Sequence, residues 1–233
     1  MCPTSCARRS TASSASEILG HELSADLAPH AHEMLDHVRH QAARLLTLVE
    51  SLLSLGRLNA GAEGIVCSRF TLSGLVEELR AEAEALNADR GLALEWKMPM
   101  APNEVEHDRT KLHAIAYHLV SNAIKFTHRG RVEVALERTP AGGVVLTVRD
   151  TGIGVPPEAR EVIFEDFRQL DGSSTRRYEG LGLGLGLVKR YTALLRGSVQ
   201  LESRPGEGTL ITVELPAPPV AAVAPTEGAE ARA

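Results

Sequence analysis

The sequence of 233 residues is poor in aromatic side chains, in cysteine and in long apolar segments. Aromatic residues make up only 3% of the chain, so a hydrophobic core must be built mainly from leucine, valine, isoleucine and alanine. The three cysteines, Cys2, Cys6 and Cys67, are odd in number and lack metal-site spacing, which favours reduced thiols. No apolar run approaches the roughly 20 residues of a membrane-spanning helix, so we expect no membrane span.

An excess of either charge is also absent, since the formal net charge is only −5. Nucleic-acid-binding proteins usually carry a basic face, so we expect no nucleic-acid partner. The first 16 residues are rich in Ser, Thr and Arg and lack the apolar centre of a secretory signal. These features favour a cytoplasmic protein.

What the chain does contain divides into four regions. Residues 1–16 and the Ala/Pro-rich residues 217–233 offer little to bury and are predicted to be disordered. Residues 17–61 have a helical pattern, and residues 68–216 mix helical and strand patterns. We therefore expect an α+β protein, in which a short helical hairpin precedes a two-layer α/β sandwich with a mixed sheet covered by helices.

The predicted elements of the larger domain follow from the spacing of apolar residues. Helices are expected over residues 72–86, 108–126 and 185–195. Strands are expected over residues 92–96, 131–137, 144–149, 198–203 and 209–215.

The hairpin carries an apolar seam on its longer helix. The seam has the 3-4-3-4-3 spacing of a helix that packs in a bundle and consists of Leu35, Val38, Ala42, Leu45, Val49 and Leu52. A hairpin this small cannot bury such a seam alone, so a second copy is predicted to complete a four-helix bundle. The sequence thus predicts a homodimer.

Two glycine-rich stretches and one polar helix segment point to a nucleotide. The stretches are residues 150–154 (Asp-Thr-Gly-Ile-Gly) and 180–186 (Gly-Leu-Gly-Leu-Gly-Leu-Gly), and the helix segment contains Asn122 and Lys125. Glycines let backbone N–H groups approach phosphate closely, an aspartate can accept the adenine amino group, and an asparagine oxygen suits magnesium. The three motifs together predict a site for ATP and Mg²⁺.

These motifs also resemble those of a known family. Residues 118–127 (His-Leu-Val-Ser-Asn-Ala-Ile-Lys-Phe-Thr), 150–154, 163–167 (Ile-Phe-Glu-Asp-Phe) and 180–186 occur in the order of the catalytic, ATP-binding domain of sensor histidine kinases. That domain shares a superfamily with gyrase-type ATPases and MutL-type repair proteins. Residues 44–61 resemble the second helix of the family's dimerisation and phosphotransfer domain.

The resemblance implies roles for particular residues. Asn122 would hold Mg²⁺ against the ATP phosphates, Lys125 would neutralise phosphate charge, and Asp150 would accept the exocyclic amine of adenine. The family usually has a second asparagine where this chain has His118, which either hydrogen-bonds near the phosphates or is a helix residue without a chemical role. The further residues that the resemblance places against ATP are Gly152, Gly154, Arg176 in a lid at residues 171–178, Gly182, Leu183, Gly184 and Thr209.

In the family, the γ-phosphoryl group passes to a histidine of the helical bundle and then to an aspartate in the receiver domain of a response regulator. The family's acceptor histidine is followed by Glu-Leu-Arg-Thr-Pro-Leu, whereas His21 keeps the Glu and Leu but lacks the Arg, Thr and Pro. In a second register, in which residues 18–20 lie beyond the acceptor, Arg9 occupies the acceptor position. We favour that register, because too few residues follow His21 before the turn for it to lie inside a helix.

Two functions therefore stay open. One is an ATP-dependent protein-histidine kinase of a two-component system, which uses His21 or a histidine of a partner chain. The other is a degenerate kinase, which binds ATP and dimerises as a signalling module without phosphorylating itself.

Overall fold

The structure is a computed structural model. It describes residues 51–165 and 182–218, together with the single helical positions 34, 38, 42, 45, 46 and 49. The chain divides into two compact units, Met1–Leu52 and Leu53–Ala233. The predicted first arm of the hairpin, His21, Arg9, the predicted lid and most of the predicted C-terminal tail lie outside the described residues.

Residues 51–59 are helical, the second unit begins within this helix at Leu53, and it continues as an alternation of strands and helices. Its elements are β1 (Ser68–Thr71), α3 (Leu72–Asn87), β2 (Ala93–Lys97), β3 (Glu104–His107), α4 (Arg109–Phe126), β4 (Arg131–Arg138), β5 (Val144–Asp150), the 3-10 turns η1 (Pro157–Ala159) and η2 (Val162–Phe164), α5 (Gly184–Leu194), β6 (Ser198–Arg204) and β7 (Gly208–Leu215).

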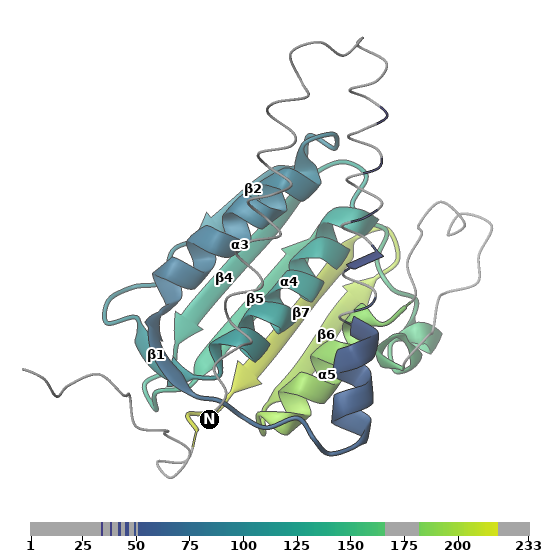
Figure 1. The fold of residues 1–233 in the computed structure, drawn as a ribbon. Helices are drawn as coiled ribbons and strands as arrows, with labels where there is room; N and C mark the ends of the chain where they lie inside the picture. Colours follow the sequence, from purple (N-terminus) through teal and green to yellow (C-terminus); the bar gives the residue numbers. More distant parts are fainter. Residues whose placement is uncertain are drawn as a thin grey trace, which may run out of the picture. The chain divides into compact units, whose positions relative to one another are not determined.

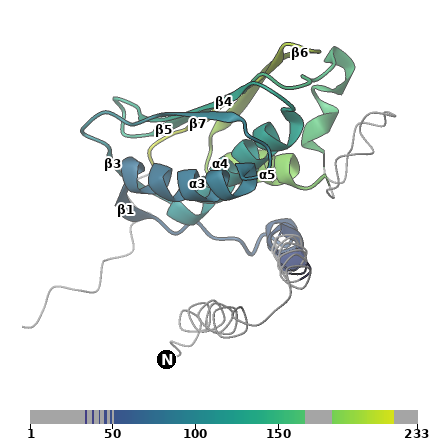
Figure 2. The ribbon, with the colours of Figure 1, turned by 90° about the horizontal axis from the view of Figure 1, so that it is seen from above.

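Five strands form one mixed sheet in the order β2-β4-β5-β7-β6. The pair β2 and β4 is parallel, and the other neighbours are antiparallel. Helices α3, α4 and α5 all lie on one face of this sheet, as Figures 1 and 2 show. This arrangement confirms the predicted two-layer α/β sandwich with a mixed sheet covered by helices.

The core lies between the sheet and the helices. In β4, residues Val132, Val134 and Leu136 are buried and alternate with more exposed residues, as a strand with one covered face requires. The predicted inner face of α4 is confirmed, since all its members are buried: Leu112, Ile115, Ala116, Leu119, Val120 and Ala123. Leu55, from the helix at residues 51–59, is buried in the same core.

Two short strands were not expected from the sequence. β1 and β3 pair in an antiparallel register, with Ser68 opposite His107, and form a separate two-stranded sheet. Each strand has only four residues, and the charged residues Glu104 and Glu106 give β3 the composition of a loop. The strands form because they pair with each other across the 32 residues, 72–103, that separate them in the chain, and no local sequence pattern indicates such a pairing.

Asp108 fixes the start of α4. Its Oδ1 atom accepts a hydrogen bond of 3.0 Å from the Lys111 backbone N–H, which makes it the N-cap of the helix. Its Oδ2 atom accepts bonds of 2.8 Å from both the Lys111 side-chain nitrogen and the Val66 backbone N–H. Lys111 Nζ also lies 3.3 Å from a carboxylate oxygen of Glu63. This buried charged cluster anchors the segment that leads into β1 against the first turn of α4.

Among the helices in the described part of the chain, none combines the length and the apolar character that crossing a membrane requires.

Candidate nucleotide site

Asp150 stands at the end of β5, opposite Val132 of β4 and Thr209 of β7. Its Oδ1 atom accepts a hydrogen bond of 2.8 Å from the Gly152 backbone N–H, and the Thr209 backbone N–H also donates to its carboxylate. Burial raises the pKa of this carboxyl group, while the two backbone donors oppose that shift. The structure therefore holds a half-buried carboxylate in a fixed orientation, free to accept a further hydrogen bond from a ligand amine.

The loop after Asp150 lies against the carboxyl end of α4. The Ile153 backbone N–H donates to the Phe126 carbonyl oxygen at 3.2 Å. A Cβ atom on Gly152 would lie 2.5 Å from that same oxygen and 2.8 Å from Asp150 Oδ1, so a larger residue would displace the carboxylate. Glycine at position 152 is what allows Asp150, the loop and α4 to approach one another. Gly154 follows in the same loop.

The start of α5 lies next to the middle of α4. A Cβ atom placed on Gly184 would lie 3.3 Å from His118 Nδ1 and 3.6 Å from the side-chain nitrogen of Asn122, so the start of α5 lies close against both side chains. His118 and Asn122 are four residues apart, one turn of α4, and therefore share a face. Both side chains thus adjoin the amino end of α5.

The first turn of α5 can attract an anion. Leu183 is its N-cap and makes no side-chain capping bond, and the first turn holds no acidic residue. The first backbone N–H groups of a helix have no partner inside the helix and carry its positive dipole end. Gly182 precedes this turn with a positive φ of 69°. Phosphate groups suit such a position.

Lys125 follows Asn122 by three residues, on the last turn of α4. Its backbone carbonyl accepts a hydrogen bond of 3.0 Å from Arg90 Nη1, which also bonds the Ile124 carbonyl at 2.9 Å. Arg90 thus caps the carboxyl end of the helix that carries Asn122 and Lys125. This role could not be predicted from the sequence, because Arg90 lies 34 residues from Ile124 and no motif marks it.

His118 is held neutral by its surroundings. Burial lowers the pKa of its imidazole to about 4, with a smaller contribution from the charge of His113. Its ring meets the Tyr117 ring edge-on, with 5.8 Å between centroids. His118 therefore presents an uncharged imidazole beside Gly184.

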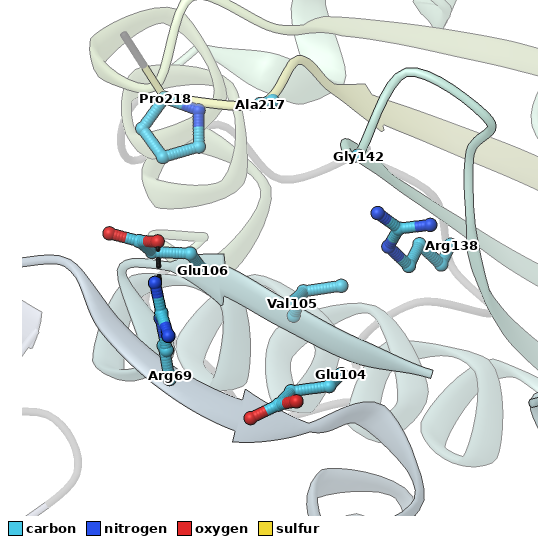
Figure 3. A pocket seen from close by; sticks show the side chains of 8 residues that line it. All are labelled: Arg69, Glu104, Val105, Glu106, Arg138, Gly142, Ala217 and Pro218. Carbon is cyan, nitrogen blue, oxygen red and sulfur yellow. Dashed lines mark hydrogen bonds and ion pairs between the residues drawn. The ribbon is translucent and has the colours of Figure 1, made fainter. Parts of the chain in front are cut away.

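The structure brings most of the candidate residues together along the carboxyl half of α4. Asp150 and Gly152 lie at its end, Gly154 lies against the backbone of Arg204, and Asn122 and His118 adjoin Gly184. Arg176 and His21 lie outside the described residues. A pocket of about 330 Å³ among the described residues lies elsewhere, between β3 and the turn after β4, and is lined by Arg138 and Gly142 (Figure 3). Since Arg138 pairs with Val144, at the opposite end of β5 from Asp150, this pocket is not part of the candidate site.

Comparison with known proteins agrees with this geometry. Residues 107–219 match the family described as "Histidine kinase-, DNA gyrase B-, and HSP90-like ATPase". This part of the chain belongs to that ATPase family. It is specifically of the histidine kinase type, as the sequence predicted, because its relatives and its structural neighbours carry that name.

Two curated relatives illustrate the likeness. The chain is 36% identical to "Hybrid signal transduction histidine kinase D" of Dictyostelium discoideum over 190 residues. The aligned region covers 79% of this chain and 12% of that protein. It is 30% identical to "Signal transduction histidine-protein kinase BarA" of Escherichia coli (strain K12) over 192 residues. The aligned region covers 80% of this chain and 21% of that protein. The chain therefore spans only a minor part of these relatives.

Solved structures share the fold. Full-length ShkA, crystallised in complex with AMPPNP, aligns with a TM-score of 0.67 at 30% sequence identity, over 82% of this chain and 40% of that one. The Acinetobacter baumannii histidine kinase AdeS aligns with a TM-score of 0.62 at 20% identity, over 86% of this chain and 91% of that one, which bears on the fold alone.

Proposed function

We propose that the chain binds Mg-ATP along the carboxyl half of α4 and is the catalytic part of a two-component protein-histidine kinase. The observation that carries the proposal is the placement of Asp150. Its carboxylate is oriented by two backbone N–H groups, and the adjoining helix α4 leads from it to Asn122 and the amino end of α5.

Asp150 is the residue that would recognise adenine. A carboxylate whose donors are both backbone N–H groups keeps its remaining lone pairs for a hydrogen bond from the exocyclic amine of adenine. Guanine presents a carbonyl oxygen at that position, which would face the carboxylate without a proton between them. Gly152 and Gly154 add no side chains to the loop after Asp150, and Thr209 lies beside Asp150 on β7.

The carboxyl half of α4 and the amino end of α5 would bind the phosphates. Asn122 offers a side-chain oxygen suited to Mg²⁺, a hard cation that would bridge the phosphates and neutralise their charge. The amino end of α5, with Gly182, Leu183 and Gly184, offers backbone N–H groups and a positive dipole. Lys125 adds a cation on the last turn of α4, and Arg176 is proposed to add another.

In the kinase, a histidine ring nitrogen attacks the γ-phosphorus of ATP. A P–N bond forms, the bond from phosphorus to the bridging oxygen breaks, and ADP leaves with the electron pair. The residues of this domain bind and orient ATP for that transfer. The receiver domain of a response regulator is the proposed next acceptor. A degenerate module without self-phosphorylation is the second candidate, because the residues after His21 lack the Arg, Thr and Pro of the family's acceptor motif.

We expect the wild-type chain alone to take up little or no phosphate from γ-labelled ATP. In the favoured register Arg9 stands at the acceptor position, and misplacement of a nucleophile by about one ångström can cost about 100-fold in rate. The measurement is incubation with labelled ATP and magnesium, followed by acid and alkali washes, on wild type and His21→Gln.

Acid-labile label that is strong in wild type and absent from His21→Gln would show a complete kinase with His21 as acceptor. Label that persists in His21→Gln would point to another histidine. Absent label with intact ATP binding would support the degenerate module.

We also propose that the seam predicted in the helical region joins two copies of the chain. Its described members are all exposed, with 61% of Val38, 63% of Leu45, 44% of Val49 and 43% of Leu52 accessible to solvent. Apolar side chains at this spacing normally face a partner helix. Analytical ultracentrifugation should give twice the mass of one chain, and Leu45→Asp should shift the population towards monomer. A monomeric wild type at micromolar concentration would contradict the proposal.

A further inference from the structure

His107 joins two parts of the chain that are far apart in the sequence. It is the last residue of β3, is 1% exposed, and directly precedes Asp108, the N-cap of α4. Its Nδ1 atom accepts a hydrogen bond of 3.0 Å from the Asp108 backbone N–H. Its Nε2 atom lies 3.3 Å from the carbonyl oxygen of Pro216, the first residue after β7. The ring thus connects the start of α4 with the place where the chain leaves the sheet.

These two partners fix the protonation state of the ring. A backbone N–H only donates, so Nδ1 is the unprotonated nitrogen, and a carbonyl oxygen only accepts, so Nε2 carries the hydrogen. Both nitrogens of the neutral imidazole are therefore satisfied. A second proton would bury a charge and turn Nδ1–H towards another donor. Burial accordingly lowers the pKa of His107, although the Pro216 bond and the Asp108 charge oppose this shift.

The charged and titratable groups around His107 offer an added proton little compensation. Within the described residues, the elements packed against it contribute Asp108 and Lys111 of α4, Glu63 and Cys67 before β1, Arg69 of β1 and Glu106 of β3. Arg69 and Glu106 pair with each other and stand on the other face of the β1–β3 pair, because side chains alternate along a strand. Asp108 is the group whose charge acts on His107, but its carboxylate is already bonded to a lysine side chain and two backbone N–H groups.

The start of α4 also holds the segment that leads into β1. The Val66 backbone N–H donates to Asp108 Oδ2 at 2.8 Å, and Ser68 lies opposite His107 in the β1–β3 pair. Cys67 stands between these two contacts and is 8% exposed. We therefore expect its thiol to become accessible when this segment leaves the start of α4.

On its other side His107 holds the chain that leaves β7. A pocket lies between β3 and this part of the chain, and Ala217 and Pro218 line it together with Glu106 (Figure 3). Within the described residues, the bond from His107 Nε2 is the one hydrogen bond between β3 and residues 216–218. A single side chain thus closes this end of the domain.

We propose that His107 is a pH-sensitive latch, which as a neutral imidazole holds residues 66–68 and 216–218 closed on the start of α4 and opens this junction when its Nδ1 takes up a proton from water. A charged ring can still donate to Pro216, so the buried charge and the facing Asp108 N–H are what drive the opening. The protonated ring is more stable in water, and moving there gives up both attachments.

The direction of the pH dependence follows from the two states of the junction. In the open junction the ring has an ordinary pKa of about 6.5, whereas the pKa in the closed junction is lower. The open state therefore binds more protons, so closure is fully favoured above pH 6.5 and weakens as the pH falls below it. The candidate nucleotide site lies towards the carboxyl end of the 18-residue helix α4, so the latch does not depend on ATP binding.

The test measures how well the fold protects the Cys67 thiol, in the full chain with Cys2→Ser and Cys6→Ser so that one thiol remains. Its rate of reaction with dithiodipyridine, which attacks thiols even in mild acid, is divided by the rate in urea-unfolded chain at the same pH. Between pH 7.5 and 5.0 this ratio should rise about 3- to 30-fold, where 30-fold is the largest effect of one histidine with an open-state pKa of about 6.5.

Two variants make the test specific. His107→Gln keeps an N–H donor for Pro216 but cannot take up a proton at this pH, so it should remove the rise. His113→Gln changes another histidine of α4, one that is 26% exposed, and should leave the rise as in wild type. A rise below twofold in wild type, or an equal rise in His107→Gln, would overturn the latch.

Two further measurements separate the latch from other causes. Urea denaturation at each pH gives the fraction of globally unfolded chain, and a Cys67 ratio equal to that fraction would overturn a separate opening of the junction. If His107→Gln does not fold, ¹⁵N-histidine NMR of wild type decides. The ring should be the neutral Nε2–H tautomer at pH 7.5, and the Ala217 amide resonance should move with the same midpoint as the ring. A ring that titrates while this amide stays unmoved would overturn the proposal.

Discussion

Lys111→Ala is expected to lower the free energy of unfolding by about 3–5 kcal/mol, the cost of breaking a buried ion pair. The Lys111 side chain is 6% exposed and its partner Asp108 is 1% exposed. Alanine would leave the carboxylates of Asp108 and Glu63 without their cation in a largely buried site. The measurement is urea denaturation followed by circular dichroism, with the slope against urea concentration compared between variants.

Lys97→Ala is the matched control. Lys97 pairs with Glu137 on the surface, where the two side chains are 69% and 50% exposed. An exposed pair contributes at most about 1 kcal/mol, so this variant should unfold close to wild type. Equal losses in the two variants would contradict the assignment of a buried, stabilising cluster at the start of α4.

The wild-type chain is expected to lose stability as the pH falls from about 6.5 to about 4, and His118→Asn should remove much of that loss. The unfolded chain takes up a proton on this histidine near pH 6.5, whereas burial lowers the pKa of folded His118 to about 4. Below pH 6.5 the unfolded state therefore binds more protons, and the free energy of unfolding falls with pH. The shift corresponds to about 3 kcal/mol at the acid end.

The measurement is the difference in unfolding free energy between wild type and His118→Asn at pH 7.5 and at pH 4.5. His107 also has a pKa lowered by burial, but it is present in both chains and cancels in the difference. Parallel pH profiles for the two chains would show that His118 is not held neutral by the fold.

The nucleotide motifs and the sandwich could be predicted because their signals are local. The apolar spacing of α4 and the alternation of β4 each lie within one element, and both were confirmed. Gly152 also gives a local signal, because a glycine in such a motif indicates a close approach of the backbone. In the structure any larger side chain at this position would meet Phe126 and Asp150.

What the sequence did not reveal depends on residues far apart in the chain. Val66 reaches Asp108 across 42 residues, and Arg90 reaches Ile124 across 34. The roles proposed for Asn122, Lys125 and Thr209 stay predictions.

Calorimetric titration of the full chain with Mg-ATP and Mg-GTP, on wild type and Asp150→Asn, tests the central claim most directly. Wild type should bind Mg-ATP at one site per chain and prefer it over Mg-GTP. Asp150→Asn keeps the size of the side chain but can present a donor to the adenine amine, and a buried mismatch of this kind costs about 1–3 kcal/mol, or about 5- to 150-fold in affinity. Absence of Mg-ATP binding in wild type, or an unchanged preference for adenine in Asp150→Asn, would contradict the assignment of this site.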